Sequence, residues 1–269
     1  MGNMTWIHNL SVWFVVPAIL AIFVSLALIG LFVTRQWSRK RGLHTLVDNS
    51  VIGWIYSAIL GIYAIALGLV AVASWSNSSA ASDASSHEAS EIAAIYRDVG
   101  GYPEPLQGQL KAPLVRYTRY VIDEAWPLQR RGEFPHGGTK ILYDFQRILF
   151  SYEPKTEGQK ILHGEVLRSF NTLVEFRRLR LEAVSYSVPS TLWCVVIIGA
   201  VLAIASSYVF NLDSLLVHAT MIGLLAAMIG LIVYFIAIND SPYLGDKGVG
   251  PEAYELVFRD LMTPAPAPP

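Results

Sequence analysis

Residues 51–73 read VIGWIYSAILGIYAIALGLVAVA, a run without a single Asp, Glu, Lys or Arg. In a helix, about 20 such residues cross the ~30 Å hydrocarbon core of a bilayer. Three further stretches have the same character, namely residues 13–33, 188–210 and 215–238. Backbone polar groups in lipid must be satisfied within their own segment, which favours helices. The sequence therefore predicts four transmembrane helices.

The composition agrees with this prediction. The chain is 53% hydrophobic and 15% charged, whereas soluble domains carry about a quarter charged residues. The formal net charge of −1 argues against a nucleic-acid partner, which requires a basic patch. We therefore expect an integral, multi-pass membrane protein, with the lipid bilayer as its surroundings.

The four spans are grouped as two hairpins. A basic link, residues 35–41, joins the first pair, and a short link, residues 211–214, joins the second. About 115 residues separate the hairpins, too many for a loop, and their apolar spacing is helical. We expect an all-α membrane protein, divided into a first hairpin (1–73), a helical extramembrane domain (74–187), a second hairpin (188–240) and a C-terminal tail (241–269).

The second span has no Pro or Gly where it leaves the membrane. From Ser74 the sequence becomes Ser-rich without a break. We therefore expect one helix to continue to Asp98, where Gly100-Gly101-Tyr102-Pro103 ends it.

Three more helices are predicted in the middle region from apolar residues at three- and four-residue spacing. The first is expected to begin near Leu106 and to end at Pro127 and Gly132. The second is expected to begin at Gly137-Gly138, and the third to begin after Pro154. This third helix runs towards the third span, where Pro189 either kinks it or starts the span.

Small residues recur along the second span at intervals of four, three, four and three. This small-residue stripe consists of Ser57, Gly61, Ala64, Gly68, Ala71, Ser78 and Ser82, and the same phase reaches Ser85. One interpretation is close packing of membrane helices, which small residues permit. The other is the wall of a pore, with small and hydroxyl-bearing side chains facing water. A shorter run in the fourth span, Ala219, Gly223, Ala226 and Gly230, indicates packing.

A basic band of Arg177, Arg178 and Arg180 precedes the third span. We expect these side chains to lie at the interface and reach lipid phosphates. The alternative is that they attract anions to a vestibule. Asp123-Glu124 and the pair Glu88/Glu91 are candidate partners for arginines.

Asp240 and Pro242 follow the fourth span directly. Pro242 cannot continue the helix, and a short carboxylate accepts hydrogen bonds from nearby backbone N–H groups. We expect a structural clamp that ties the fourth span to the middle domain, with an arginine of the basic band as partner of Asp240.

No constellation typical of an enzyme is present. The sequence has no nucleotide-binding loop, zinc signature, nucleophile elbow or catalytic dyad. The spans contain no Asp, Glu, Lys or Arg, which disfavours proton-coupled transport. We expect no catalytic residues, no metal and no cofactor.

With these segments placed, the chain resembles the bestrophin-like domain family. The matching stretches are Glu88-Ala89-Ser90, Ile95-Tyr96-Arg97-Asp98, Tyr117, Glu124-Ala125-Trp126-Pro127, Arg177-Arg178-Leu179-Arg180-Leu181, Val188-Pro189, Leu192-Trp193 and Asp240-Ser241-Pro242-Tyr243-Leu244-Gly245. Because bestrophins are pentameric ion channels, the resemblance implies a membrane-bound oligomeric channel. Since the family includes bacterial membrane proteins, the resemblance also implies placement in a bacterial inner membrane. The chain lacks a recognisable bestrophin pore-neck motif and an acidic calcium clasp, so chloride selectivity, calcium gating and five-fold symmetry are not carried over.

The resulting expectation is a homo-oligomeric channel or channel-like pore for inorganic ions, lined by the second span and its Ser-rich extension. The alternative is a non-conducting membrane sensor or scaffold whose helical domain binds a partner.

Topology gives a first prediction. Short loops rich in Lys and Arg lie on the cytoplasmic side of a membrane. This rule places the basic link, residues 35–41, in the cytoplasm, and both termini and the middle domain on the outer side. Bestrophin topology points the opposite way. In a Cys194→Ala background, we expect Ser38→Cys to stay unlabelled when an impermeant thiol reagent is applied to intact cells, and to react after permeabilisation. Labelling of intact cells would reverse the assignment.

Overall fold

The computed structural model describes residue 8 and residues 10–41 and 49–263, and these residues form helices and turns with no strand among them. The chain divides into two compact units. We call Leu10–Ser76 with Ser187–Asp240 the membrane unit, and Asn77–Tyr186 with the residues from Ser241 onward the helical unit. Helix α3 (Asn49–Asp98) contributes residues to both.

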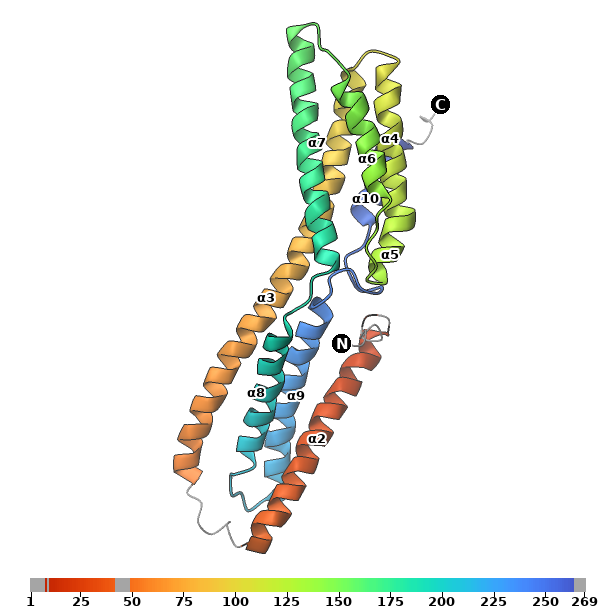
Figure 1. The fold of residues 1–269 in the computed structure, drawn as a ribbon. Helices are drawn as coiled ribbons and strands as arrows, with labels where there is room; N and C mark the ends of the chain where they lie inside the picture. The colour runs from red at the N-terminus through yellow and green to blue at the C-terminus, as the bar shows by residue number, and fades with distance from the viewer. Residues whose placement is uncertain (1–7, 9, 42–48, 264–269) are drawn as a thin grey trace. The chain divides into compact units, whose positions relative to one another are not determined.

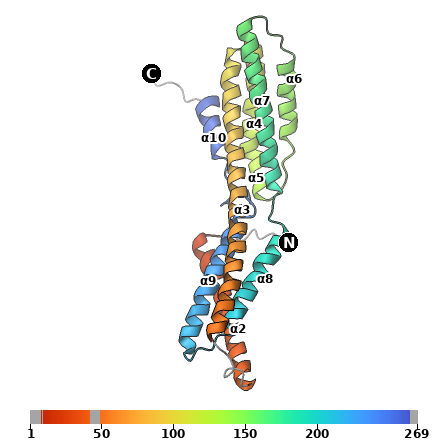
Figure 2. The same cartoon turned by 90° about the vertical axis from the view of Figure 1, so that its left-hand side faces the viewer.

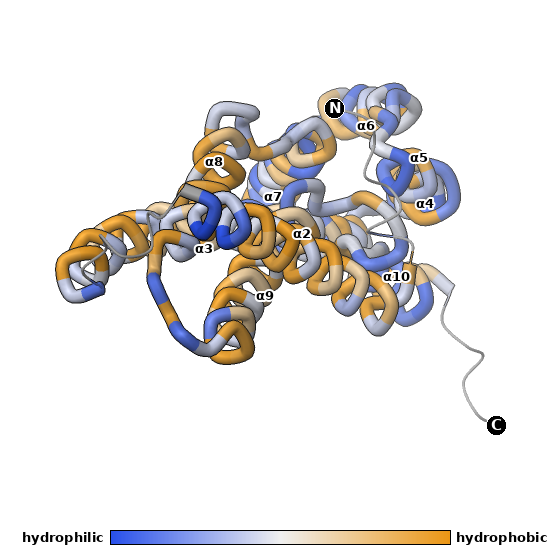
Figure 3. Tube along the Cα trace, turned by 90° about the horizontal axis from the view of Figure 1, so that it is seen from below, coloured by the Kyte–Doolittle hydropathy of each residue, from blue (hydrophilic) through white to orange (hydrophobic). Residues whose placement is uncertain are grey.

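The membrane unit confirms the predicted all-α membrane fold. Its helices are α2 (Val12–Arg41), the first part of α3, α8 (Ser190–Ser207) and α9 (Leu215–Asn239). Each is long and apolar enough to cross a membrane, and Figure 3 shows how apolar α2, α8 and α9 are. Residues 35–41, expected as a link between two helices, instead form the last part of α2. Residues 42–48 lie outside the described part of the chain.

Helix α9 holds the membrane unit together by packing against both α2 and α8 (Figures 1 and 2). Ala27 and Leu31 of α2 form a buried cluster with Ile222 and Ala226 of α9. A Cβ atom added to Gly230 would come 3.2 Å from the ring of Phe23. The packing interpretation of the small residues in the fourth span is therefore confirmed.

Hydrogen bonds connect the two hairpins at the α8–α9 link. Asn49, the first residue of α3, donates to the carbonyl of Asn211 at 2.7 Å and accepts from its N–H at 2.9 Å. The Arg35 guanidinium of α2 donates to the carbonyls of Leu212 and Asp213. The ends of α2 and α3 are thus fixed to the same turn.

Helix α3 is one uninterrupted helix of 50 residues, as the absence of Pro and Gly breaks beyond the second span predicts. It ends in a 3₁₀ turn at Val99–Gly101, and Tyr102 then adopts extended backbone.

The remaining helices belong to the helical unit. They are α4 (Leu106–Tyr120), α5 (Trp126–Arg130), α6 (Gly138–Phe150), α7 (Glu157–Val184) and α10 (Glu252–Val257). Pro127 was expected to end a helix, but it lies in the first turn of α5, directly after a π-helical turn at Val121–Ala125. A proline is tolerated there because the first turn of a helix needs no backbone N–H from it. The closure comes at Gly132, whose φ of +75° is left-handed.

Two further boundaries have a local cause. Thr156 and Gln159 form a capping box that begins α7. Pro189 is the N-cap of α8, so it starts the third span rather than kinking the preceding helix.

The core of the helical unit is built from apolar side chains of α3, α4, α6 and α7. The C-terminal segment also enters it: Tyr243 and Tyr254 are buried, and the indole of Trp126 donates to the carbonyl of Val249 at 3.0 Å. Residues 241–262 therefore pack as part of the helical unit.

Candidate functional site

In the membrane unit, one face of α3 is buried. Tyr63, Leu67, Val70 and Ser74 are at most 7% exposed, and their spacing places them on one side of the helix. The Tyr63 hydroxyl donates to the carbonyl of Val196 at 3.1 Å. This face holds α3 against α8 and α9.

The small-residue stripe lies beside this buried face and stays open. Ser57, Gly61, Ala64 and Gly68 are all exposed. A Cβ atom added to Gly61 or Gly68 would meet nothing within 4 Å. These small residues therefore do not serve helix packing within the chain.

A third face of α3 carries bulky apolar side chains. Ile62, Ile65, Leu69 and Val72 are 73%, 68%, 66% and 62% exposed. Large apolar side chains of this kind are suited to lipid contact, whereas small ones permit close approach of another helix. Helix α3 thus has two exposed faces. One carries bulky side chains suited to lipid, and the other carries small residues that permit close approach of another helix.

The stripe does not keep its exposure along the whole helix. At seven-residue intervals, Ser57 and Ala64 are exposed, Ala71 and Ser78 are half-buried, and Ser85 is buried. An α-helix drifts by about 20° per heptad relative to a strict seven-residue repeat. The small-residue stripe therefore turns gradually towards the buried side of α3. The prediction that it stays on one face as far as Ser85 is wrong.

A buried ion pair joins α3 to α7 in the helical unit. Nε of Arg180 donates to Glu88 at 2.7 Å, and Nη2 donates to the other carboxylate oxygen at 3.3 Å. The Tyr117 hydroxyl of α4 donates to Glu88 at 2.6 Å, and Arg180 also donates to the Gln129 side chain of α5. Both charged side chains are at most 2% exposed, so four helices meet at one charge pair.

The environment of the pair keeps the arginine charged. Burial by itself lowers the pKa of Arg180, but the adjacent Glu88 carboxylate outweighs it and raises that pKa well above its usual value. Burial, and then Glu88, raise the pKa of Tyr117. The hydroxyl therefore remains a donor to the carboxylate.

The structure corrects the expected basic band. Arg180 is in the core and is not available to lipid or anions. Arg178 pairs with Glu182 on the surface at 3.3 Å, and Arg177 donates to the Thr139 hydroxyl at 2.9 Å. The cause is the rotation of about 100° per residue around the axis of α7, which turns Arg180 inward while Arg178 and Leu179 stay exposed. Glu88, considered only as a candidate partner for arginines, is the residue that Arg180 binds.

Asp240 connects the end of the fourth span with the beginning of the third. Its carboxylate accepts from the backbone N–H of Val188, and the Trp193 side chain is a second donor to it. Both donors belong to the membrane unit, and the pairing of Asp240 with an arginine of the basic band stays a prediction. Pro242 has a separate role: its carbonyl accepts from Val249 at 2.8 Å and closes a C-terminal loop.

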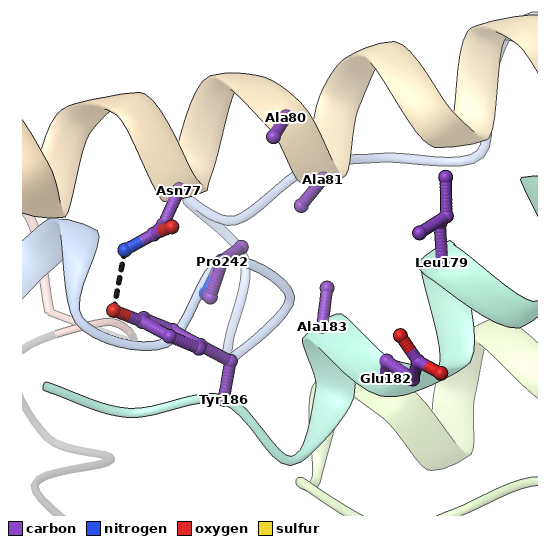
Figure 4. A pocket seen from close by; sticks show the side chains of 8 residues that line it. All are labelled: Asn77, Ala80, Ala81, Leu179, Glu182, Ala183, Tyr186 and Pro242. Atoms are coloured by element: carbon purple, nitrogen blue, oxygen red, sulfur yellow. Dashed lines mark hydrogen bonds between the residues drawn. The ribbon is translucent and has the colours of Figure 1, made fainter.

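A hollow of about 220 Å³ lies between α3 and α7 in the helical unit. Figure 4 shows Ala81 facing Ala183 across it, with Asn77 donating to the Tyr186 hydroxyl at one side. Ligand pockets usually measure about 300–1,000 Å³, so we assign no ligand to this hollow. Among the residues that the structure describes, no three His, Cys, Asp or Glu side chains come together to hold a metal.

The ion pair generates a stability prediction. Glu88→Gln leaves the Arg180 guanidinium buried without a counter-charge, which costs about 3–5 kcal/mol of unfolding free energy. Chemical denaturation of the detergent-solubilised protein, followed by circular dichroism, measures the loss. The matched control is Arg178→Gln, whose exposed pair should contribute less than about 1 kcal/mol. Equal losses in both variants would contradict a central role for the buried pair.

Comparison with known proteins agrees with this architecture. Among solved structures, a bacterial bestrophin homologue from Klebsiella pneumoniae carrying a point mutation superposes with a TM-score of 0.67 at 14% identity, covering 92% of this chain and 97% of that one. A variant described as a membrane protein gives a TM-score of 0.66 at 13% identity, with the same coverage. At such identities the likeness shows the fold.

No curated protein sequence matches the chain. The bestrophin-like domain model matches residues 21–254, most of the chain. The protein belongs to the bestrophin-like domain family.

Proposed function

We propose that the chain is the subunit of a homo-oligomeric ion channel, with α3 nearest the axis of a ring. The observation that carries this proposal is the exposed small-residue stripe, where a Cβ atom added to Gly61 or Gly68 would meet no atom of the described residues within 4 Å. A face of this kind suits either a neighbouring copy or water in a pore.

The stripe is the proposed pore lining within and beyond the span. Ser57, Gly61, Ala64 and Gly68 would line the membrane part, and the half-buried Ala71, Ser78 and Ser82 would continue it. A heterologous contact that closes on itself gives a ring. The partners would be lipid, further copies of the chain and inorganic ions.

Family membership supports a channel rather than an enzyme. It also supports placement in a bacterial inner membrane, which we retain as part of the proposal. The half-buried Arg177 and the exposed Arg178, the remainder of the basic band, are proposed to reach lipid phosphates. Asp240 is proposed as a clamp between the third and fourth spans.

One observation favours a non-conducting scaffold instead. Tyr143 and Phe150 lie seven residues apart on α6 and are 64% and 63% exposed. An exposed aromatic pair on one helix face is a feature of protein-binding surfaces. Ion flux distinguishes this second function from the first.

The test uses the purified protein in liposomes. We expect wild-type protein to conduct ions and Gly61→Leu to lose most of the flux, because the added side chain overpacks the subunit contact or fills the pore. The matched control is Ala58→Leu, which makes a comparable change on the bulky face of the same helix, next to Ile62 and Ile65.

Three results would contradict the proposal. Wild-type liposomes that carry no flux would favour the scaffold. A monomeric particle mass in nanodiscs would remove the ring. An equal effect of Ala58→Leu and Gly61→Leu would remove the special role of the stripe.

A further inference from the structure

Two buried polar side chains beside the Glu88–Arg180 pair are only partly satisfied. Gln129 of α5 and Tyr254 of α10 are 1% and 0% exposed. The Nε2 atom of Gln129 and the hydroxyl of Tyr254 have no hydrogen-bond partner among the residues that the structure describes. Buried polar groups almost always have a partner, from the protein or from ordered water, so these two groups point to a bound acceptor.

The orientation of the Gln129 amide is fixed by its neighbour. Arginine side chains carry donors and no acceptor, and Nη1 of Arg180 donates to Oε1 of Gln129. An exchange of Oε1 and Nε2 would bring two donors together at this contact. The hydrogens of Nε2 therefore require an acceptor elsewhere.

The Tyr254 hydroxyl differs from those of two other buried tyrosines near the pair. Tyr117 donates to Glu88 at 2.6 Å, and Tyr243 donates to the carbonyl of Ala81 at 2.8 Å. Burial, and then the charge of Glu88, raise the pKa of Tyr254 well above its usual value. Its hydroxyl therefore stays protonated and is a buried donor.

Both groups belong to side chains that lie against Arg180. The Cζ atom of Arg180 is 5.9 Å from the ring centroid of Tyr254 and 5.6 Å from that of Trp126, near the ~6 Å outer limit of a cation–π contact. Trp126 precedes Gln129 by three residues in α5, and its ring centroid is 5.3 Å from that of Tyr254. Gln129 and Tyr254 therefore approach the same guanidinium from different helices.

Donors outnumber acceptors around this guanidinium. Nε, Nη1 and Nη2 of Arg180 each donate once within the described residues, which leaves one further N–H on each Nη atom. Gln129 adds two N–H groups and Tyr254 one O–H group. The group that completes this site is therefore an acceptor.

We propose that a water molecule binds beside Arg180 and bridges Nε2 of Gln129 to the hydroxyl of Tyr254. Buried waters typically make about three hydrogen bonds to groups that are otherwise unsatisfied. A small anion would also accept these bonds, but Glu88 and Arg180 already neutralise each other. A further buried charge without a counter-charge is strongly unfavourable, whereas water supplies the acceptor without charge.

The bound water gives the C-terminal segment a second polar attachment to the core. The first is the hydrogen bond from the Trp126 indole to the carbonyl of Val249. A bridging water is enthalpically nearly as good as a direct hydrogen bond. It extends the network of the ion pair from α3, α4, α5 and α7 to α10, which carries Tyr254.

Removal of the Tyr254 hydroxyl distinguishes a bridged group from an unpartnered one. An unpartnered buried hydroxyl destabilises the fold, so Tyr254→Phe would then increase stability. With the water in place, we expect Tyr254→Phe to raise the unfolding equilibrium constant of the detergent-solubilised protein about three- to tenfold. Chemical denaturation followed by circular dichroism measures this constant.

The matched control is Tyr143→Phe, which removes a hydroxyl from a tyrosine that is 64% exposed. It should leave the unfolding equilibrium constant unchanged. A more stable Tyr254→Phe variant, or an effect no larger than that of the control, would overturn the bound water.

A structure at a resolution that shows ordered water tests the site directly. The wild-type density should contain a peak within hydrogen-bond distance of both Oη of Tyr254 and Nε2 of Gln129, and Tyr254→Phe should lose or displace it. A direct hydrogen bond between the two side chains, or density without such a peak, would overturn the proposal.

Replacing chloride by gluconate at constant ionic strength separates water from an anion. The stability of the wild type should not change, because water is present in both solutions. A loss of stability in the wild type that Tyr254→Phe does not share would overturn the water in favour of a buried anion.

Discussion

The Glu88–Arg180 pair is the interaction on which the helical unit depends. It is buried, bidentate and completed by Tyr117 and Gln129. An unpaired charge in that position would be strongly unfavourable, so α3 and α7 have little freedom to rotate or slide past each other. The pair thereby fixes which side of α3 is buried and which side faces outward.

The second constraint is the mismatch between helical and heptad periods. A strict seven-residue pattern on a straight helix drifts steadily around its axis. Along α3 this drift takes the small-residue stripe from exposure at Ser57 to burial at Ser85. In the helical unit, the buried face of α3 is therefore set by the helix and its ion pair, and it includes Ser85.

The sequence was sufficient for the spans, the unbroken α3 and the helix opening at Gly137-Gly138, because these follow from local length, hydropathy and backbone preferences. Pairing was harder to predict. Arg180 closely follows Arg177 and Arg178 in the sequence and looks like part of a basic cluster, and only its position around the axis of α7 turns it inward to Glu88. Asp240 likewise has a backbone N–H as partner, which leaves no trace in the side-chain pattern. Exposure of the stripe also depends on tertiary packing.

The central claim is that α3 lies nearest the axis of a ring of identical chains. Distances between spin labels on different copies test it most directly. In a Cys194→Ala background, labels at Ala64→Cys on α3 and at Leu26→Cys on α2 both replace exposed residues of the membrane unit. The account predicts a defined intermolecular distance for each, shorter for Ala64→Cys than for Leu26→Cys. The reverse order, or no intermolecular distance at either site, would contradict it.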